Sequence, residues 1–295
     1  MTGAEQGFLL LTSHLGDPEC KPLTVAQFRT LPMRAMAMTP QDDVRELRST
    51  DLTALGYDQA AARHIVQLLE REDQLEYYVN HGAKKECHPL ARIHRRYPDI
   101  LRRRLGLDSP GCLWYKGDVS LLGQPMISLV GSRELRGENE AFAAEVGRQA
   151  ALQGYVLVSG NARGADKTAQ ESCLAQGGQV ISVVADSLED CVLTNRVLYL
   201  SEDGFELRFS AQRALSRNRI IHCLGQATVV AQCSLEKGGT WKGTALNLRR
   251  EWSPVVCFHD HSPGIDALIE QGATGITAAD LKDLDALCLT RNSFL

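Results

Sequence analysis

From Met126 onwards the sequence alternates short, continuously apolar segments with stretches of helical pattern. The apolar segments are residues 126–130, 155–158, 180–184, 227–230 and 254–258. A strand with one face in water would alternate polar and apolar residues, so uninterrupted apolar strands joined by helices are typical of a parallel sheet that is covered on both faces. We therefore expect an α/β fold with a parallel sheet over residues 126–280.

The first 82 residues carry a different pattern, which predicts a small helical domain. Apolar residues at helical spacing indicate one helix around residues 23–31 and a second around 42–47. A third helix should begin at Asp58, continue towards Tyr78 and stop at Gly82. Such a domain docks on DNA or on a partner, or it packs as a cap on the main domain, and the sequence leaves both roles open.

A basic segment, residues 83–125, leads into the expected sheet, and the chain closes with a tail at 281–295. The net charge of −4 argues against a protein whose whole surface is basic. Between residues 84 and 104, however, basic side chains far outnumber Glu86 and Asp99. They are Lys84, Lys85, Arg92, Arg95, Arg96, Arg102, Arg103 and Arg104. They predict either a patch that contacts phosphates or a solvated helix face with a linker.

The nine cysteines are scattered without a C-x-x-C pair, which favours free thiols in a reducing compartment. The densest metal-like grouping is His81, Cys87, His88 and His94. Its spacing matches no zinc site, so we expect no metal ion and no other cofactor. No segment approaches the roughly 18 apolar residues that span a bilayer, and the apolar run at residues 8–11 is too short for a signal peptide. We therefore expect a cytoplasmic protein without a membrane partner.

Three polar, glycine-bearing turns follow strands of the expected sheet. They are Gly131-Ser132-Arg133, Ser159 to Asp166, and Lys237-Gly238-Gly239-Thr240. Free amides and the helix dipole favour an anion at a helix N-terminus, and Arg133 and Lys237 would add full charges. Because ligands of a parallel sheet bind at the carboxyl ends of its strands, the three turns predict one phosphate pocket.

Two further features bear on the same pocket. Arg217, Asn218 and Arg219 precede apolar residues, which fits a helix whose start faces the pocket; the alternative for these arginines is surface ion pairing. Asp166 is the acid within the second turn. A carboxylate there caps the loop by accepting backbone N–H bonds, or acts as a catalyst, and we favour capping.

The order of these motifs resembles the DNA-processing protein A family. G-S-R, S-G-x-A-x-G-x-D, R-N-R-I-I and G-G-T follow one another, and G-x-x-x-L-I-x-x-G-A stands at residues 264–273. Upstream, residues 97–101 and 113–118 resemble the segments that lead into the sheet of that family. The resemblance covers residues from about 80 to 280, with a weaker match in the helical N-terminal part.

What the resemblance implies is a Rossmann-like domain that binds single-stranded DNA, forms a homodimer and helps to load the recombinase RecA during DNA-mediated transformation or recombination. Together with the turns, it gives an expected phosphate- and DNA-binding site without a catalytic residue. The expected site consists of Gly131, Ser132, Arg133, Ser159, Gly160, Arg163, Gly164, Asp166, Arg217, Asn218, Arg219, Lys237, Gly238, Gly239 and Thr240. Single-strand binders usually add an aromatic platform for the bases. The family often has one three residues before R-N-R, where this chain has Ala214, and the nearest aromatic residue is Phe209.

Two other functions stay open. Proteins of the LOG type have a similar fold and hydrolyse nucleoside monophosphates at the N-glycosidic bond, using the glutamate of P-G-G-x-G-T-x-x-E. The matching position here is Ala245 or Asn247, so Asp166 or Glu236 would have to substitute. This favours a protein that is not an enzyme. The third function is that of a sensor, which would hold a nucleotide-derived signal in the same cradle without converting it.

Overall fold

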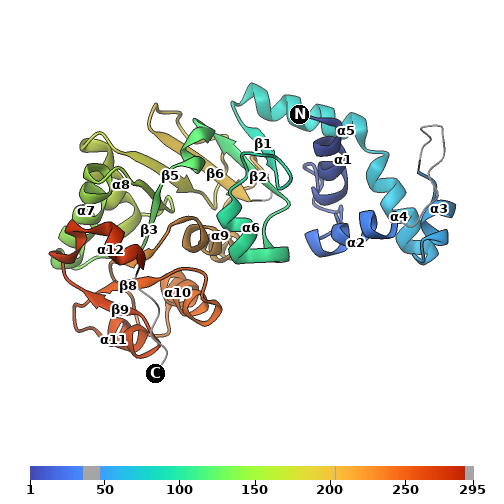
Figure 1. Cartoon of the computed structure of the whole chain (residues 1–295). Coiled ribbons are helices and arrows are strands. Elements are labelled where there is room, and N and C mark those ends of the chain that lie inside the picture. The colour runs from blue at the N-terminus through green and yellow to red at the C-terminus, as the bar shows by residue number, and fades with distance from the viewer. Residues whose placement is uncertain (36–46, 203, 290–295) are drawn as a thin grey trace.

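A nine-stranded sheet forms the centre of the computed structural model, which describes residues 1–35, 47–202 and 204–289 (Figure 1). The strands are β1 (His88–Ala91), β2 (Cys112–Lys116), β3 (Met126–Val130), β4 (Val156–Ser159), β5 (Gln179–Val183), β6 (Val197–Glu202), β7 (Thr228–Val230), β8 (Val255–Phe258) and β9 (Thr274–Ile276). Their order is β1-β2-β6-β5-β4-β3-β7-β8-β9. Strands β3 to β9 pair in parallel, which confirms the predicted sheet, whereas β1 and β2 extend its β6 edge in antiparallel pairing.

The helices fall into an N-terminal group and a group that packs on the sheet. The N-terminal group is α1 (Gly3–Thr12), α2 (Val25–Ala35), α3 (Ser49–Ala54), α4 (Gln59–Leu69) and α5 (Glu72–Lys84). The second group is α6 (Asp99–Leu105), α7 (Gly137–Leu152), α8 (Ala165–Ala175), α9 (Ala211–Leu224), α10 (Gly238–Arg250), α11 (Pro263–Glu270) and α12 (Leu284–Leu289). Short 3-10 turns lie at Gly106–Asp108, Val119–Gly123 and Asp280–Lys282. Within the described residues, no helix has the length and apolar character that crossing a membrane requires.

Helices cover both faces of the sheet, as the continuously apolar strands predict (Figure 1). Val130 of β3 belongs to the core with α6, α9, α10 and α11 on one face. Its neighbour Leu129 belongs to the core with α7, α8 and α12 on the other. Successive strand residues point to opposite faces, so a strand between two helical layers must be apolar throughout. Ser128 interrupts this pattern, and its hydroxyl is satisfied by the backbone of Ile221 and by the Gly225 N–H at 3.0 Å.

Helices α7 and α8 approach closely at Gly147, where a Cβ atom would collide with the backbone carbonyl oxygen of Ala169. Alanine favours a helix interior over glycine by up to about 1 kcal/mol. A backbone carbonyl cannot move aside like a side chain, however, and overpacking costs about 1–3 kcal/mol. We therefore expect Gly147→Ala to lower the free energy of unfolding by about 2 kcal/mol in chemical denaturation.

The matched control for this substitution is Gly137→Ala in the first turn of α7, where a Cβ atom would meet nothing within 4 Å. It should leave the unfolding free energy unchanged or raise it slightly. Equal stabilities of the Gly147 and Gly137 variants would contradict the close packing of α7 on α8.

The N-terminal helices differ from the prediction in their limits. Asp58 caps α4 as expected, since its side chain accepts N–H bonds from Ala60 and Ala61 at 2.9 and 2.8 Å. The helix ends at Leu69, and α5 is a separate helix that continues past Gly82 to Lys84. A Cβ atom at Gly82 would lie 2.7 Å from the Trp114 ring, so this glycine permits close packing rather than ending a helix. Most of the helix predicted at 42–47 lies outside the described residues, and α1 was not predicted.

The segment expected as a basic linker contributes two strands and a helix to the main fold, namely β1, β2 and α6. Side chains of β2 also connect the sheet to the N-terminal helices. Trp114 shares a core with Phe8 of α1, Leu75 of α5 and Phe205 beyond β6. The N-terminal helices therefore pack directly against this edge of the sheet, and the division of the chain at residues 82, 125 and 280 stays a prediction.

Candidate phosphate-binding site

The order of the sheet reverses between β3 and β7, because the chain adds β4, β5 and β6 on one side of β3 and β7, β8 and β9 on the other. Ligands of such sheets bind in the crevice outside the carboxyl ends of the strands at this switch point. A cavity of about 880 Å³ lies there. The expected site residues that line it are Gly131, Ser132, Arg133, Asp166, Arg217, Asn218, Lys237, Gly238, Gly239 and Thr240.

The N-terminus of α10 forms one wall of this cavity. The helix begins at Gly238, whose φ of 78° is a conformation that favours glycine. The first amides of a helix have no intrahelical partner and attract anions. Two side chains hold this turn in place: the Thr240 hydroxyl donates to the carbonyl oxygen of Gly131 at 2.9 Å, and the Asn218 amide donates to that of Gly239 at 3.1 Å. Thr240 and Asn218 therefore position the turn.

A largely buried charge pair forms the floor. The guanidinium Nη2 of Arg217 lies 3.8 Å from Oδ2 of Asp166, and the two side chains are 11% and 8% exposed. Burial raises the pKa of Asp166 against the attraction of Arg217, and burial lowers the pKa of Arg217. Asp166 also accepts the Ala162 N–H at 3.3 Å, which is the expected capping bond. The Nε of Arg217 is buried without a hydrogen-bond partner among the described residues, while the side chain lines the cavity and its charge favours an anion there.

Several expected site residues shape the pocket from outside it. Ser159 is fully buried, where its hydroxyl accepts from the Gln170 amide at 2.6 Å. At Gly160 a Cβ atom would collide with the guanidinium of Arg217. At Gly164, with a φ of 85°, a Cβ atom would meet the carbonyl oxygens of Ser132 and Arg133. Gly160 therefore leaves room for the side chain of Arg217, and Gly164 lets two loops approach closely.

Two arginines of the expected site do not line this cavity. Arg219 donates to the carbonyl oxygen of Asp108 at 2.7 Å and forms an ion pair with Glu202. The motif Arg217-Asn218-Arg219 was expected at a helix start, but α9 begins at Ala211 and the motif lies within the helix. Residues two apart on a helix point to nearly opposite sides, so Arg217 and Arg219 cannot both face the cavity. Arg163 is exposed, lies 3.2 Å from Glu134 and lines a second cavity near the end of β5.

Phe209 is an aromatic neighbour of the pocket that was not among the expected site residues. It is 51% exposed, and the guanidinium carbon of Arg133 lies 5.8 Å from its ring centroid. Phe209 lines both the first cavity and a second one of about 620 Å³ near the end of β5, and Arg133 and Arg217 also line both. The two cavities therefore adjoin and form a groove. The sequence signal was present, since Phe209 was the aromatic residue nearest to R-N-R.

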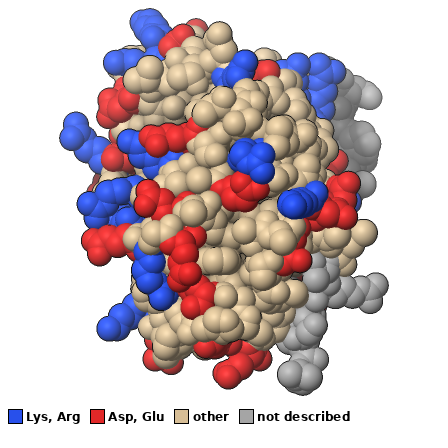
Figure 2. Space-filling model, turned by 90° about the vertical axis from the view of Figure 1, so that its left-hand side faces the viewer, with Lys and Arg blue, Asp and Glu red and all other residues tan. Residues whose placement is uncertain are grey.

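The charges that line the first cavity favour an anion. Its lining includes four cationic side chains, those of Arg133, Arg217, Lys237 and Lys242, but only two carboxylates, those of Glu134 and Asp166. By contrast, the surface turned towards the viewer in Figure 2, which is the left-hand side of Figure 1 with α7 and α8, has basic and acidic side chains interspersed. The cationic cluster thus belongs to the crevice rather than to that outer face.

The basic side chains between residues 84 and 104 have a partly structural role. Arg92, Arg102 and Arg104 donate to backbone carbonyl oxygens, for example Arg104 to that of Cys223 at 3.0 Å. Arg95, Arg96 and Arg103 are exposed. Arg92, Arg102 and Arg104 therefore fit neither expectation, because their guanidinium groups bind carbonyl oxygens of the protein itself.

The histidines and cysteines considered as a metal grouping have other contacts. His81 stacks on Tyr77, and Nε2 of His94 lies 3.8 Å from Glu5. In the described part of the chain, a different set brings three potential ligands together, namely His259, His261 and Asp266 beyond β8. It was missed because a histidine pair two residues apart is not distinctive in a sequence.

Comparison with known proteins agrees with this architecture. Residues 88–284 match the family model of the DNA recombination-mediator protein A. DNA processing protein DprA of Streptococcus pneumoniae is 32% identical over 189 residues, which are 58% of this chain and 65% of the relative. That of Bacillus subtilis is 30% identical, over 59% and 63%. The chain thus matches less than two thirds of the length of these curated relatives.

Solved structures give the same result for the fold. The X-ray structure of DprA from Streptococcus pneumoniae superposes with a TM-score of 0.70 at 24% identity, covering 97% of this chain and 98% of the other. A structure of DprA from Helicobacter pylori, described by its single-stranded DNA binding mode, superposes with a TM-score of 0.57 at 25% identity, covering 68% and 96%. The family match extends over most of the chain and includes every strand that lines the crevice, so this chain belongs to the DNA recombination-mediator protein A family.

Proposed function

We propose that this protein binds single-stranded DNA in the groove at the carboxyl edge of the sheet and acts as a recombination mediator. The observation that carries the proposal is Arg217, a largely buried cation that lines the same cavity as the N-terminal turn of α10. A backbone phosphate would lie between Arg217 and the amides of Gly239 and Thr240. The single-stranded DNA binding mode described for the Helicobacter pylori relative supports this ligand.

The shape of the groove favours a strand over a single nucleotide. The first cavity, of about 880 Å³, is large enough for one nucleotide, but it adjoins the second across Arg133 and Phe209. In single-strand binders a cationic groove follows the backbone while aromatic side chains stack on bases. We assign the phosphates to the cationic wall and one base to the exposed ring of Phe209.

The partners follow from the family rather than from the groove. We propose that the protein acts in the cytoplasm, as a homodimer, and transfers the bound strand to the recombinase RecA during transformation or recombination. Residues 1–82 would then form a helical domain that packs against the edge of the DNA-binding domain.

Fluorescence anisotropy with a labelled oligothymidylate tests the DNA proposal. With roughly four phosphates neutralised by the four cationic side chains, affinity should fall roughly 50-fold between 50 and 200 mM salt. Phe209→Ala should lower affinity by about 1–3 kcal/mol through lost stacking, with the salt dependence unchanged. The matched control is Tyr77→Ala, which removes a ring that is 70% exposed on α5 and should not alter binding.

Other outcomes would replace the proposal. Absence of salt-dependent binding at micromolar protein would exclude the strand-binding function. Equally tight binding of a mononucleotide and the oligonucleotide would favour a sensor. Release of free base from a nucleoside monophosphate would instead establish the hydrolase, with Asp166 as the first carboxylate to replace.

A further inference from the structure

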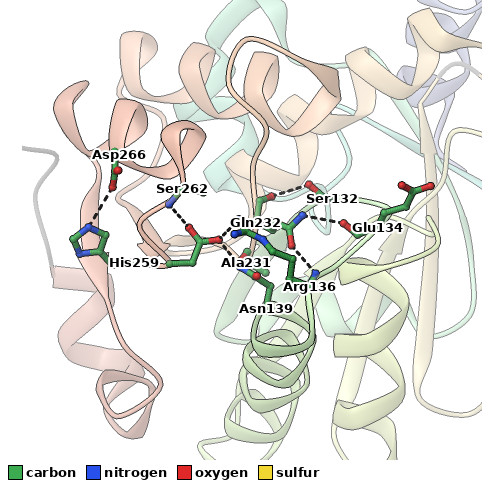
Figure 3. A network of polar contacts seen from close by, with 10 residues as sticks. Ser132, Glu134, Arg136, Asn139, Ala231, Gln232, His259, Ser262 and Asp266 are labelled. Atoms are coloured by element: carbon green, nitrogen blue, oxygen red, sulfur yellow. Dashed lines mark hydrogen bonds and ion pairs between the residues drawn. The ribbon is translucent and has the colours of Figure 1, made fainter.

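The turn after β8 and the first part of α11 bring together three potential metal ligands outside the phosphate pocket. Nε2 of His259 lies 3.3 Å from Oδ1 of Asp266, and the rings of His259 and His261 are 4.1 Å apart between centroids. Figure 3 shows His259 and Asp266 facing each other from the turn and from α11. One ligand atom from each of the three residues lies within 4.8 Å of the others. Side chains this close can bind a single ion.

The residue between the two histidines fixes the turn. The side chain of Asp260 is fully buried, where it accepts bonds from the Asn139 amide at 2.8 Å, the Arg136 guanidinium at 2.9 Å and the Ser262 N–H at 2.9 Å. These bonds attach the turn to α7 and to the start of α11 (Figure 3). The flanking imidazoles are exposed, and their separation is therefore set by an anchored backbone.

The ligand chemistry selects the class of ion. Two imidazole nitrogens and one carboxylate suit Zn²⁺ and neighbouring first-row divalent ions, whereas Mg²⁺ and Ca²⁺ prefer oxygen ligands alone. Three protein ligands leave at least one position for water, as in open zinc sites. We propose that His259, His261 and Asp266 bind one Zn²⁺ or a similar first-row divalent ion on the surface beside the phosphate groove.

An ion pair between His259 and Asp266 is the simplest alternative, but it does not account for His261. That residue adopts a φ of 54°, which is uncommon for a side chain other than glycine. Its ring lies against that of His259, and in the described part of the chain no hydrogen bond holds it. A shared metal ion accounts for both imidazoles and for the carboxylate.

Isothermal titration of the full chain with Zn²⁺, in a non-chelating buffer, tests the proposal. We expect one site whose affinity falls by roughly 100-fold in His259→Ala and in Asp266→Asn, since even outer partners of metal ligands change affinity by about 10–100-fold. The matched control is His88→Ala, which removes another exposed imidazole at the start of β1. The zinc affinity of this variant should equal that of the unaltered protein.

Cobalt absorption identifies the ligands independently, because the chain also has nine cysteines. Co²⁺ at the proposed site should give d–d bands without a thiolate charge-transfer band, and His261→Ala should remove them. A thiolate band, an unchanged zinc affinity in the His259 and Asp266 variants, or no zinc binding would each overturn the proposal. DNA binding is not part of this measurement, so its result is independent of the proposed function.

Discussion

Arg217→Ala is expected to lower the affinity for an oligothymidylate by at least about 30-fold. The substitution removes one member of a largely buried ion pair, and truncating one member of a buried charge pair at an interface costs about 2–5 kcal/mol. It also leaves the Asp166 carboxyl on the pocket floor without its cation. Any ionised fraction of Asp166 would then repel the phosphate directly, so the loss should exceed that from an exposed cation such as Lys242.

The same motif offers the matched control. Arg219→Ala removes an arginine two residues away that pairs with Glu202 outside the cavity, so DNA affinity should change less than about twofold where the variant is folded. The double variant Arg217→Ala, Asp166→Asn should recover part of the affinity, because the uncompensated carboxylate is gone. Equal losses in the Arg217 and Arg219 variants would contradict the assigned groove.

One buried histidine, His222 of α9, should contribute to the loss of stability in acid. Its Nδ1 lies 3.2 Å from the Asn247 amide and 3.3 Å from the Thr228 hydroxyl, and its buried Nε2 has no partner among the described residues. Burial, with a smaller effect from Arg217, lowers the pKa of His222 to about 3. An unfolded histidine has a pKa of about 6.5, so the unfolded chain binds the proton first as the pH falls.

The sign of the effect follows from this order. The contribution of neutral His222 to stability is complete above about pH 6.5 and is lost as the pH falls towards 3, amounting to about 3 kcal/mol between pH 7 and pH 4. His222→Gln cannot take up a proton there. We therefore expect the unfolding free energies of the two proteins, measured in urea, to converge by about 3 kcal/mol over this range.

The exposed His88 provides the control for the titration. His88→Gln should follow the pH dependence of the unaltered protein throughout. The unfolding free energies of the His222 variant and the unaltered protein could instead differ by a constant amount from pH 7 to pH 4. That result would mean that His222 binds protons equally in the folded and unfolded chains.

The sequence predicted those strands that can be recognised from their own apolar side chains. Strands β3, β4, β5, β7 and β8 consist mainly of apolar residues and lie in the middle of the sheet. Strand β6 was missed because it ends in Ser201 and Glu202. Both are buried in the structure, and Glu202 accepts bonds from Ser216 and Arg219, which lie on a helix that follows later in the chain. Such burial depends on tertiary partners that a local pattern does not contain.

The candidate site was predicted to a similar extent. The turns after β3 and before α10 line the cavity, because the carboxyl ends of parallel strands must lie at one edge. The orientation of R-N-R could not be predicted in the same way, since it depends on where α9 begins. The cap at Ser210 places that start six residues before Arg217 and fixes which arginine faces the groove.

The shared core around Trp114 has a consequence for how this protein unfolds. The family-matched part begins at residue 88, yet Trp114 and Phe205 are covered by side chains of α1 and α5, which precede it. A chain shortened to residues 88–284 would expose these rings as a contiguous apolar patch, and such patches promote self-association. The N-terminal helices and the adjacent edge of the sheet should therefore melt in one cooperative step, and shortened versions of the chain should aggregate unless α1 and α5 are retained.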